Sequence, residues 1–132
     1  MGYMEIERFV RLFVRKERRE RLLYELTNPK KRSAGLDRFC HQSESLLEPK
    51  RILMRGDDLE RRAEFRAFLA KHGEPCLLLS PGAAPEELPA EQAVALAAVR
   101  CDAALILGDG FAVVIGEATK GGRGKYLLSV SY

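Results

Sequence analysis

Two runs of apolar residues flank an Asp-Gly pair late in the chain. The runs cover residues 103–107 and 111–117, and Asp109-Gly110 lies between them. Asp-Gly in this position predicts a tight β-hairpin, because a type I′ turn needs positive φ at both central residues and Gly and Asp tolerate it. With Asp109 and Gly110 as the turn, the predicted pairs are Leu107 with Ala112, Ile106 with Val113 and Ala104 with Ile115.

The apolar residues of this hairpin occupy both faces, which predicts a sheet that is covered on both sides. One face would carry Ala104, Ile106, Val113 and Ile115, and the other Ala103, Leu105, Leu107, Ala112 and Val114. A second turn near Gly121-Gly122 would add a last strand over residues 125–131. It predicts Glu117 opposite Tyr126, Ile115 opposite Leu128 and Val113 opposite Val130.

Upstream of the hairpin, short apolar runs alternate with amphipathic stretches. Strands are expected near residues 52–54 and 76–79, and helices over residues 57–73 and 89–101. Such alternation predicts right-handed crossovers that join parallel strands. We therefore predict an α/β fold with a mixed sheet of about five strands, in the order β-α-β-α-β-β-β.

The front of the chain has a helical pattern. Residues 3–27 predict one long helix with apolar clusters at its two ends and a charged run, residues 15–21, between them. A second helix would begin at Asn28 or at Ser33 and end by about Ser43. The expected organisation is a basic helical arm of two helices over residues 1–48, followed by a compact α/β domain over residues 49–132.

The net charge of +3 is distributed unevenly. Residues 1–51 carry 13 Lys and Arg against 8 Asp and Glu, a net of +5, and the rest of the chain carries a net of −2. The charged run is either a solvated helix face or a surface for the phosphates of nucleic acid. The candidate anion-binding or nucleic-acid-binding residues are Lys30, Lys31, Arg32, Arg123 and Lys125.

No stretch resembles a leader peptide or approaches the roughly 20 apolar residues of a membrane span. We expect a cytoplasmic protein without membrane association. The cysteines, Cys40, Cys76 and Cys101, are odd in number and far apart, which favours buried thiols. His41 and His72 have no carboxylate or nucleophile in register, so they predict no catalytic triad.

An acidic row is the first candidate site. In the predicted hairpin Asp102 faces Glu117, and like charges in opposed positions destabilise a sheet unless a cation, a shared proton or the basic loop neutralises them. Two such carboxylates beside Lys120 can hold Mg²⁺ or Mn²⁺ and direct a water molecule at a phosphodiester. The alternative is a solvated carboxylate pair, partly neutralised by Lys120 or Arg123.

This stretch resembles the core of the PD-(D/E)xK nucleases, in which a helix, an Asp, a strand, a turn and a second strand lead to an acid followed by Lys. The resemblance covers about residues 90–120 and implies catalysis by Asp102, Glu117 and Lys120 with a divalent metal. The sequence departs from the pattern in its spacing, Glu117-Ala118-Thr119-Lys120, which points Lys120 to the other face of the strand unless a bulge redirects it.

A second candidate follows from topology. Ligands of open α/β sheets bind outside the carboxyl ends of the parallel strands. The residues expected there are Arg55, Gly56, Asp57, Ser80, Pro81, Gly82 and Asp109. Each of them is also a common turn or cap residue. On the predicted topology, these residues and the acidic row lie at opposite ends of the third strand.

Three functions are consistent with these features. The first is a non-catalytic binding or adaptor protein that uses its N-terminal helix to bind a protein partner or a second copy of itself. The second is nucleic-acid binding through the basic helical arm and the basic loop. The third is a metal-dependent phosphodiesterase or nuclease acting through Asp102, Glu117 and Lys120. We favour the first, because it requires no chemistry that the sequence does not display.

Overall fold

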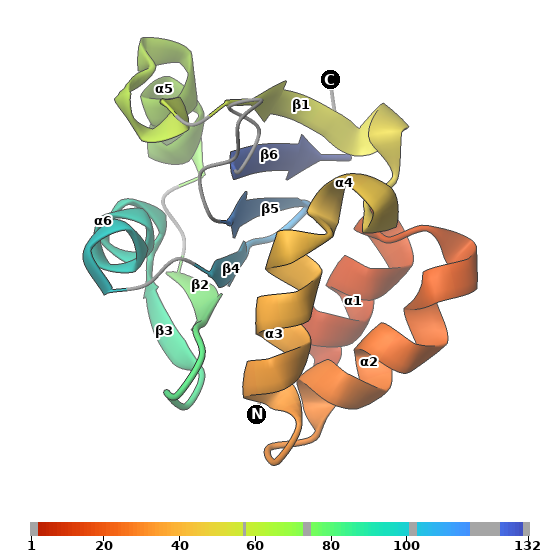
Figure 1. Ribbon diagram of the computed structural model, residues 1–132. Helices are drawn as coiled ribbons and strands as arrows, with labels where there is room; N and C mark the ends of the chain where they lie inside the picture. The colour runs from red at the N-terminus through yellow and green to blue at the C-terminus, as the bar shows by residue number, and fades with distance from the viewer. Residues whose placement is uncertain (1–2, 57, 73–74, 101–102, 117–124, 131–132) are drawn as a thin grey trace.

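The protein folds into three layers, with helices on both faces of a central β-sheet (Figure 1). In this computed structural model the described residues are 3–56, 58–72, 75–100, 103–116 and 125–130. One face of the sheet is covered by the N-terminal helices α1 to α4, and the other face by α5 and α6. The predicted α/β class with an N-terminal helical region is confirmed.

Within the described residues the helices are α1 (Tyr3–Phe13), α2 (Arg19–Thr27), α3 (Arg32–His41), α4 (Ser43–Leu46), α5 (Ala63–Lys71) and α6 (Ala90–Arg100). Short 3₁₀ turns are η1 (Lys16–Arg18), η2 (Pro49–Arg51) and η3 (Leu59–Arg61). The strands are β1 (Ile52–Arg55), β2 (Pro75–Leu79), β3 (Glu86–Pro89), β4 (Ala104–Leu107), β5 (Phe111–Ile115) and β6 (Lys125–Ser129).

The described strands form one sheet in the order β1-β6-β5-β4-β2-β3, and every neighbouring pair is antiparallel. The predicted mixed sheet with parallel neighbours is therefore wrong. Helix α5 does join two strands of the same direction, β1 and β2, but three other strands lie between them. Helix α6 joins β3 and β4 with β2 between them. The crossover through α5 joins strands of the same direction as expected, whereas β2 and β4, which the helix at 89–101 was expected to join in parallel, are antiparallel neighbours.

The β4–β5 hairpin has the register that the Asp-Gly turn predicts. Leu107 pairs with Ala112 and Ala104 pairs with Ile115, as expected. The turn geometry differs from type I′, since Gly110 has a φ of 80° whereas no described non-glycine residue has positive φ. Positive φ at the second central residue alone is the pattern of a type II turn, in which Gly is needed at that one position.

The predicted register of the last strand is wrong by three residues. Val113 pairs with Leu127 rather than Val130, and Ile115 pairs with Lys125 rather than Leu128. Because the shift is odd, each side chain of β6 lies on the face opposite to the predicted one. Tyr126, expected beside the acidic row, instead pairs with Val114 and is buried in the core at 1% exposure.

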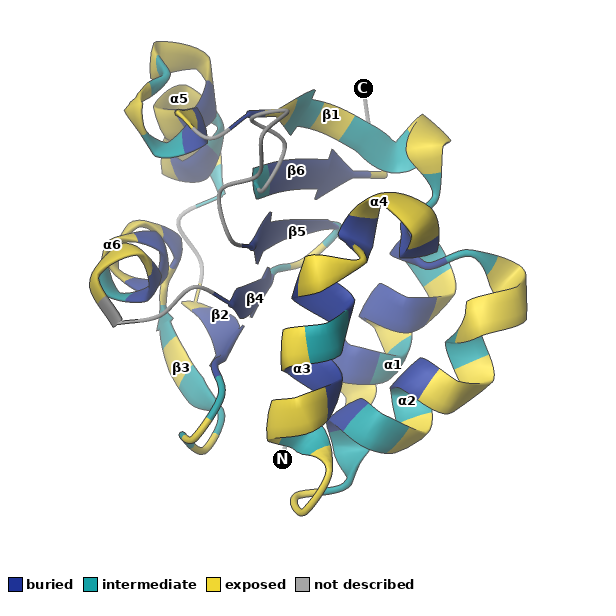
Figure 2. Cartoon of the chain, in the orientation of Figure 1, coloured by how far each residue is buried: buried dark blue, intermediate teal, exposed yellow. Residues whose placement is uncertain are grey.

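Each face of the sheet carries the residues that its hairpin pattern predicts. Leu105, Leu107 and Val114 pack with the N-terminal helices, whereas Ile106 and Val113 pack with α5 and α6. Figure 2 shows the same division on the helices, whose buried sides face the sheet and whose exposed sides face outward. Both faces of the sheet are thus removed from water, and one apolar core lies on each face.

The predicted long helix over residues 3–27 is broken in its polar middle. Helix α1 ends at Phe13, Val14 forms a β-bridge with Leu47, and α2 begins at Arg19 after a 3₁₀ turn. The apolar clusters at its two ends therefore pack in the same core, and α3 completes that layer. The helical region has three main helices and the short α4 rather than the expected two.

Candidate binding site

Several residues of the first candidate site lie outside the described part of the chain. They are Asp102, Glu117, Lys120 and Arg123. The described residues near them show where the strands meet. Ala104 pairs with Ile115, and Ile115 pairs with Lys125. The start of β4, the end of β5 and the start of β6 therefore meet at one end of the sheet, which we call the Lys125 end.

The described residues that follow β1 and β2 also lie at the Lys125 end. The Gly56 N–H donates a hydrogen bond to the carbonyl of Lys125 at 3.0 Å, and Leu79 at the end of β2 pairs with Leu105 near the start of β4. Asp109 lies at the opposite end, since it follows β4, which runs antiparallel to β2. The expectation that Asp109 shares one strand end with the residues after β1 and β2 is therefore wrong.

Lys125, a predicted anion-binding residue, is paired with a carboxylate. Its Nζ lies 2.9 Å from both carboxylate oxygens of Glu60. Partial burial raises the pKa of Glu60, but the hydrogen bonds and charge of Lys125 outweigh that effect, so the pKa lies below its usual 4.5. An anion that binds Lys125 would have to compete with Glu60.

The predicted cluster of Lys30, Lys31 and Arg32 is divided in the fold. Lys30 and Lys31 are exposed before α3. Arg32 is half-buried, and its Nε donates to the carbonyl of Leu26 at 2.7 Å, where it satisfies an acceptor in the last turn of α2. Two of the three cations thus face solvent, and the third stabilises a helix end.

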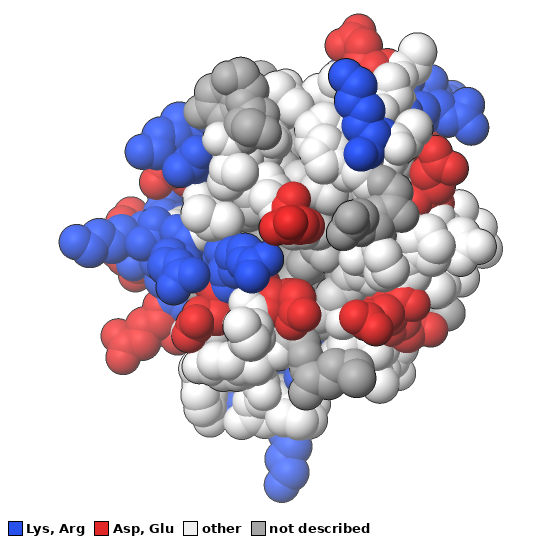
Figure 3. Space-filling model, turned by 180° about the vertical axis from the view of Figure 1, so that it is seen from behind, with Lys and Arg blue, Asp and Glu red and all other residues white. Residues whose placement is uncertain are grey.

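Other arginines of the basic front also hold the helices together. The Arg15 Nε donates to the carbonyl of Leu47 and the Arg19 Nε donates to the carbonyl of Val14, both at 2.9 Å. Arg38 makes a bidentate ion pair with Glu25. In Figure 3 the basic side chains gather on the side of the N-terminal helices, with acidic side chains among them. Several arginines of the basic front are therefore used in internal contacts, while most of its Lys and Arg side chains are exposed.

Each described imidazole contacts a group other than a thiol. Burial raises the pKa of Cys76 to about 11, which keeps the thiol protonated. The His72 ring stacks on Phe68 with centroids 4.3 Å apart, and His41 Nε2 lies 3.7 Å from Asp37 on the exposed side of α3. Among the described residues there is also no group of three or more His, Cys, Asp or Glu side chains arranged for a metal ion.

A pocket of about 250 Å³ lies between α5 and α6, on the face of the sheet away from the N-terminal helices. Helical spacing explains its two walls. Phe65 and Leu69, four residues apart on α5, are buried toward the sheet, so the next residue, Arg66, is turned by about 100° around the helix. Ala95 and Ala98 line the other wall, and their methyl groups leave the space between the helices open.

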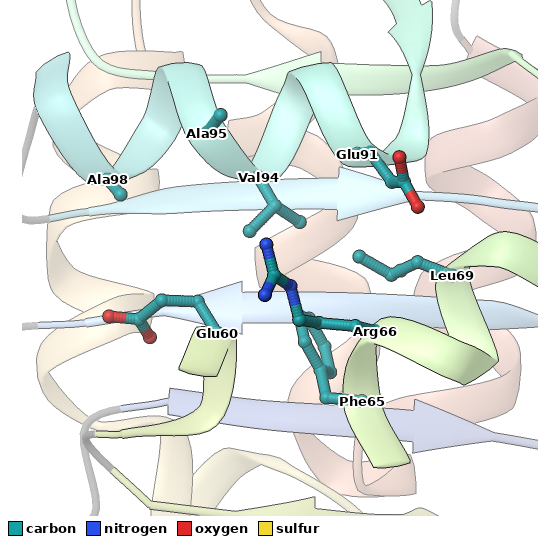
Figure 4. Close-up of a pocket in the computed structure, with 8 residues that line it drawn as sticks. All are labelled: Glu60, Phe65, Arg66, Leu69, Glu91, Val94, Ala95 and Ala98. Carbon is teal, nitrogen blue, oxygen red and sulfur yellow. The ribbon is translucent and has the colours of Figure 1, made fainter. Parts of the chain in front are cut away.

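Arg66 extends its guanidinium into this pocket (Figure 4). The guanidinium lies over Val94 and between the carboxylates of Glu60 and Glu91. Neither carboxylate forms an ion pair with it, and the Arg66 side chain has no hydrogen-bond acceptor among the described residues. The pocket therefore combines an apolar floor with a cation whose donors point into open space.

Sequence reasoning missed this site. Arg66 is one of many arginines in the chain, and its role depends on how closely α6 approaches α5 across the sheet. The one available signal was the exposed side of α6, where Ala95, Ala98 and Val99 replace the charged residues usual on a solvent-facing helix. Val99 is 87% exposed. A small, uncharged helix surface is typical of a binding surface, although it does not identify the partner.

No protein-family model matches the chain, and neither a similar curated protein nor a similar solved structure was found. None of the helices in the described segments is both long enough and apolar enough to span a membrane.

Proposed function

We propose that the protein is a non-catalytic binding domain and that the pocket between α5 and α6 is its binding site. The observation that carries this proposal is the guanidinium of Arg66 above the apolar floor of that pocket, where no described residue pairs with it. Ligand sites are concave and mostly apolar, with a few polar groups that orient the ligand. This pocket has that composition.

The distribution of buried apolar residues also favours this face for binding. Ile6, Phe9 and Phe13, the apolar residues that a partner of the first helix would contact, are each 2% exposed or less and pack in the protein's own core. The N-terminal helices thus act as the cover of the sheet. The opposite layer has only α5 and α6 among its described helices, and the space between these two helices is accessible to a ligand.

The test is a two-dimensional ¹H–¹⁵N NMR titration of the whole chain with small apolar probes, including benzyl alcohol, octanamide and octanoate. We expect the shifted signals to cluster on α5 and α6, and we expect Ala95→Phe, which fills one wall, to abolish them. Ala67→Phe is the matched control, because Ala67 is exposed on α5 and does not line the pocket. Shifts on the N-terminal helices, or binding that survives Ala95→Phe, would contradict the proposal.

A second candidate is a metal-dependent phosphodiesterase acting through Asp102, Glu117 and Lys120. It is supported by the pairing of Ala104 with Ile115, since these residues lie two positions from Asp102 and Glu117 on adjacent strands. Titration of Mn²⁺ or Mg²⁺ followed by thermal melting tests it. The metal should raise the melting temperature of the wild type and leave an Asp102→Asn, Glu117→Gln variant unchanged; equal responses of the two proteins would refute this candidate.

A further inference from the structure

We propose that the ligand of the α5–α6 pocket is a small monocarboxylate with a short apolar body. This inference rests on the proposed binding function and specifies the chemistry of the ligand. Arg66 would bind the carboxylate, and the floor of the pocket would bury the apolar part.

Arg66 offers the cation for an anionic ligand at this pocket. A guanidinium stays protonated at all physiological pH values and presents its N–H donors in a planar fork. Arg66 is exposed, so water hydrates its guanidinium in the free protein, and no described residue accepts from these donors, which point into a pocket with an apolar floor. A carboxylate matches the fork with two parallel hydrogen bonds, which is the geometry that arginine favours.

The surrounding charges favour a single negative charge on the ligand. Glu60 is neutralised by Lys125, and Glu91 has no ion-pair partner among the described residues. Arg66 and Glu91 therefore contribute opposite charges beside the same pocket. A monoanion gains the attraction of Arg66 with limited repulsion, whereas a phosphate dianion or a nucleic-acid backbone brings more negative charge close to both glutamates.

The size of the pocket limits the apolar body. Its volume of about 250 Å³ is slightly below the usual range of ligand pockets, roughly 300–1,000 Å³. Phe65, Leu69 and Val94 supply the apolar floor, and Ala95 and Ala98 supply a wall without polar side-chain atoms. The pocket therefore suits a short alkyl chain or a single ring better than a folded peptide or a large cofactor.

The experiment is a calorimetric titration of the full chain with sodium octanoate, with octanamide as the uncharged probe of the same length. We expect octanoate to bind the wild type about two- to fivefold more tightly than it binds Arg66→Met, because the ion pair that is lost involves an exposed arginine. Octanamide should bind both proteins equally. Arg18→Met is the control, since it removes the same charge from an exposed residue of η1 on the other helical layer.

Each other outcome has a distinct meaning. Equal binding of octanoate by the wild type and Arg66→Met would refute the carboxylate assignment, and retained binding of octanamide would leave the binding function intact. Tighter binding of inorganic phosphate than of octanoate would also overturn the assignment, because the apolar body would then contribute nothing. If neither octanoate nor octanamide shifts the NMR signals of α5 and α6, both the inference and the proposed function fail.

Discussion

Replacing Phe39 by Ala tests whether the N-terminal helices and the sheet form one cooperative unit. Phe39 of α3 is fully buried in the core that the N-terminal helices share with the sheet, and its ring meets the Phe9 ring edge to face with centroids 5.8 Å apart. Phe-to-Ala changes in such cores cost about 3–5 kcal/mol, and an edge-to-face pair contributes about 0.5–1.5 kcal/mol of packing energy. We expect a loss of about 4 kcal/mol, a large part of the 5–15 kcal/mol typical of a domain.

The assay is urea unfolding followed by far-ultraviolet circular dichroism and by tyrosine fluorescence. In a Tyr3→Phe, Tyr24→Phe, Tyr132→Phe variant, Tyr126 is the remaining tyrosine, and its fluorescence reports on the sheet. Both signals should shift together to lower urea in Phe39→Ala. The aromatic control is Tyr24→Ala in a background that retains the other tyrosines; Tyr24 is 56% exposed, and we expect a loss below about 1 kcal/mol.

Two results would refute this reasoning. A loss below about 1 kcal/mol for Phe39→Ala would show that the helical layer contributes little to the folded core. Separate transitions of the dichroism and of Tyr126 fluorescence would show that the helices and the sheet unfold independently.

Three further predictions concern named charges and thiols. Glu25→Gln removes the bidentate partner of Arg38, and we expect a loss of about 1–3 kcal/mol in urea unfolding, against less than about 0.5 kcal/mol for the exposed Glu20→Gln. Because the pKa of Glu60 is lowered in the fold, its contribution to stability is present above pH 4.5 and is lost as the pH falls through the lowered pKa. Lys125→Met should therefore reduce the fall in melting temperature on the acid side. A melting temperature that depends on pH as in the wild type would contradict this prediction. Burial raises the pKa of Cys76 to about 11. In a Cys40→Ser, Cys101→Ser variant we therefore expect this thiol to react with Ellman's reagent at pH 8 only as fast as the protein unfolds. Rapid labelling of the folded protein would disprove this prediction.

The hairpin around Asp109-Gly110 could be predicted in detail because its information is local. A two-residue turn fixes the register, and the apolar residues on its two sides fix the faces. The next hairpin connects β5 to β6 through residues 116–124, a length for which many registers are sterically possible. The predicted pairing of Val113 with Val130 was wrong for that reason.

The break in the first helix and the order of the sheet depend on distant contacts. Residues 3–27 have good helix formers throughout, but Val14 pairs with Leu47 and Arg19 binds the carbonyl of Val14, so the chain turns where no Gly or Pro marks a turn. The sequence pattern does not predict the short strand β3, which follows Pro85 and ends in Pro89, because Pro is a poor strand residue except at an edge.

The candidate pocket could not be predicted because its parts come from different segments. Arg66 belongs to α5 and Glu91 to α6, and neither residue type in isolation indicates a site. The distance between these two side chains depends on how both helices pack on the same face of β4, β5 and β6. Sequence patterns predict both helices, but they do not give the distance between them.

The order of the sheet also constrains how the chain can fold while it is being synthesised. Strand β1 leaves the ribosome early, yet its neighbour in the described sheet is β6, the last of the described strands to be made. The buried side of the N-terminal helices likewise awaits residues of β4, β5 and β6. Ile6, Phe9 and Phe13 therefore emerge long before their sheet exists, and during that interval they are exposed to chaperones and to aggregation. The sheet therefore cannot be completed until β6 has left the ribosome, and slow translation of the earlier segments alone should not accelerate that step.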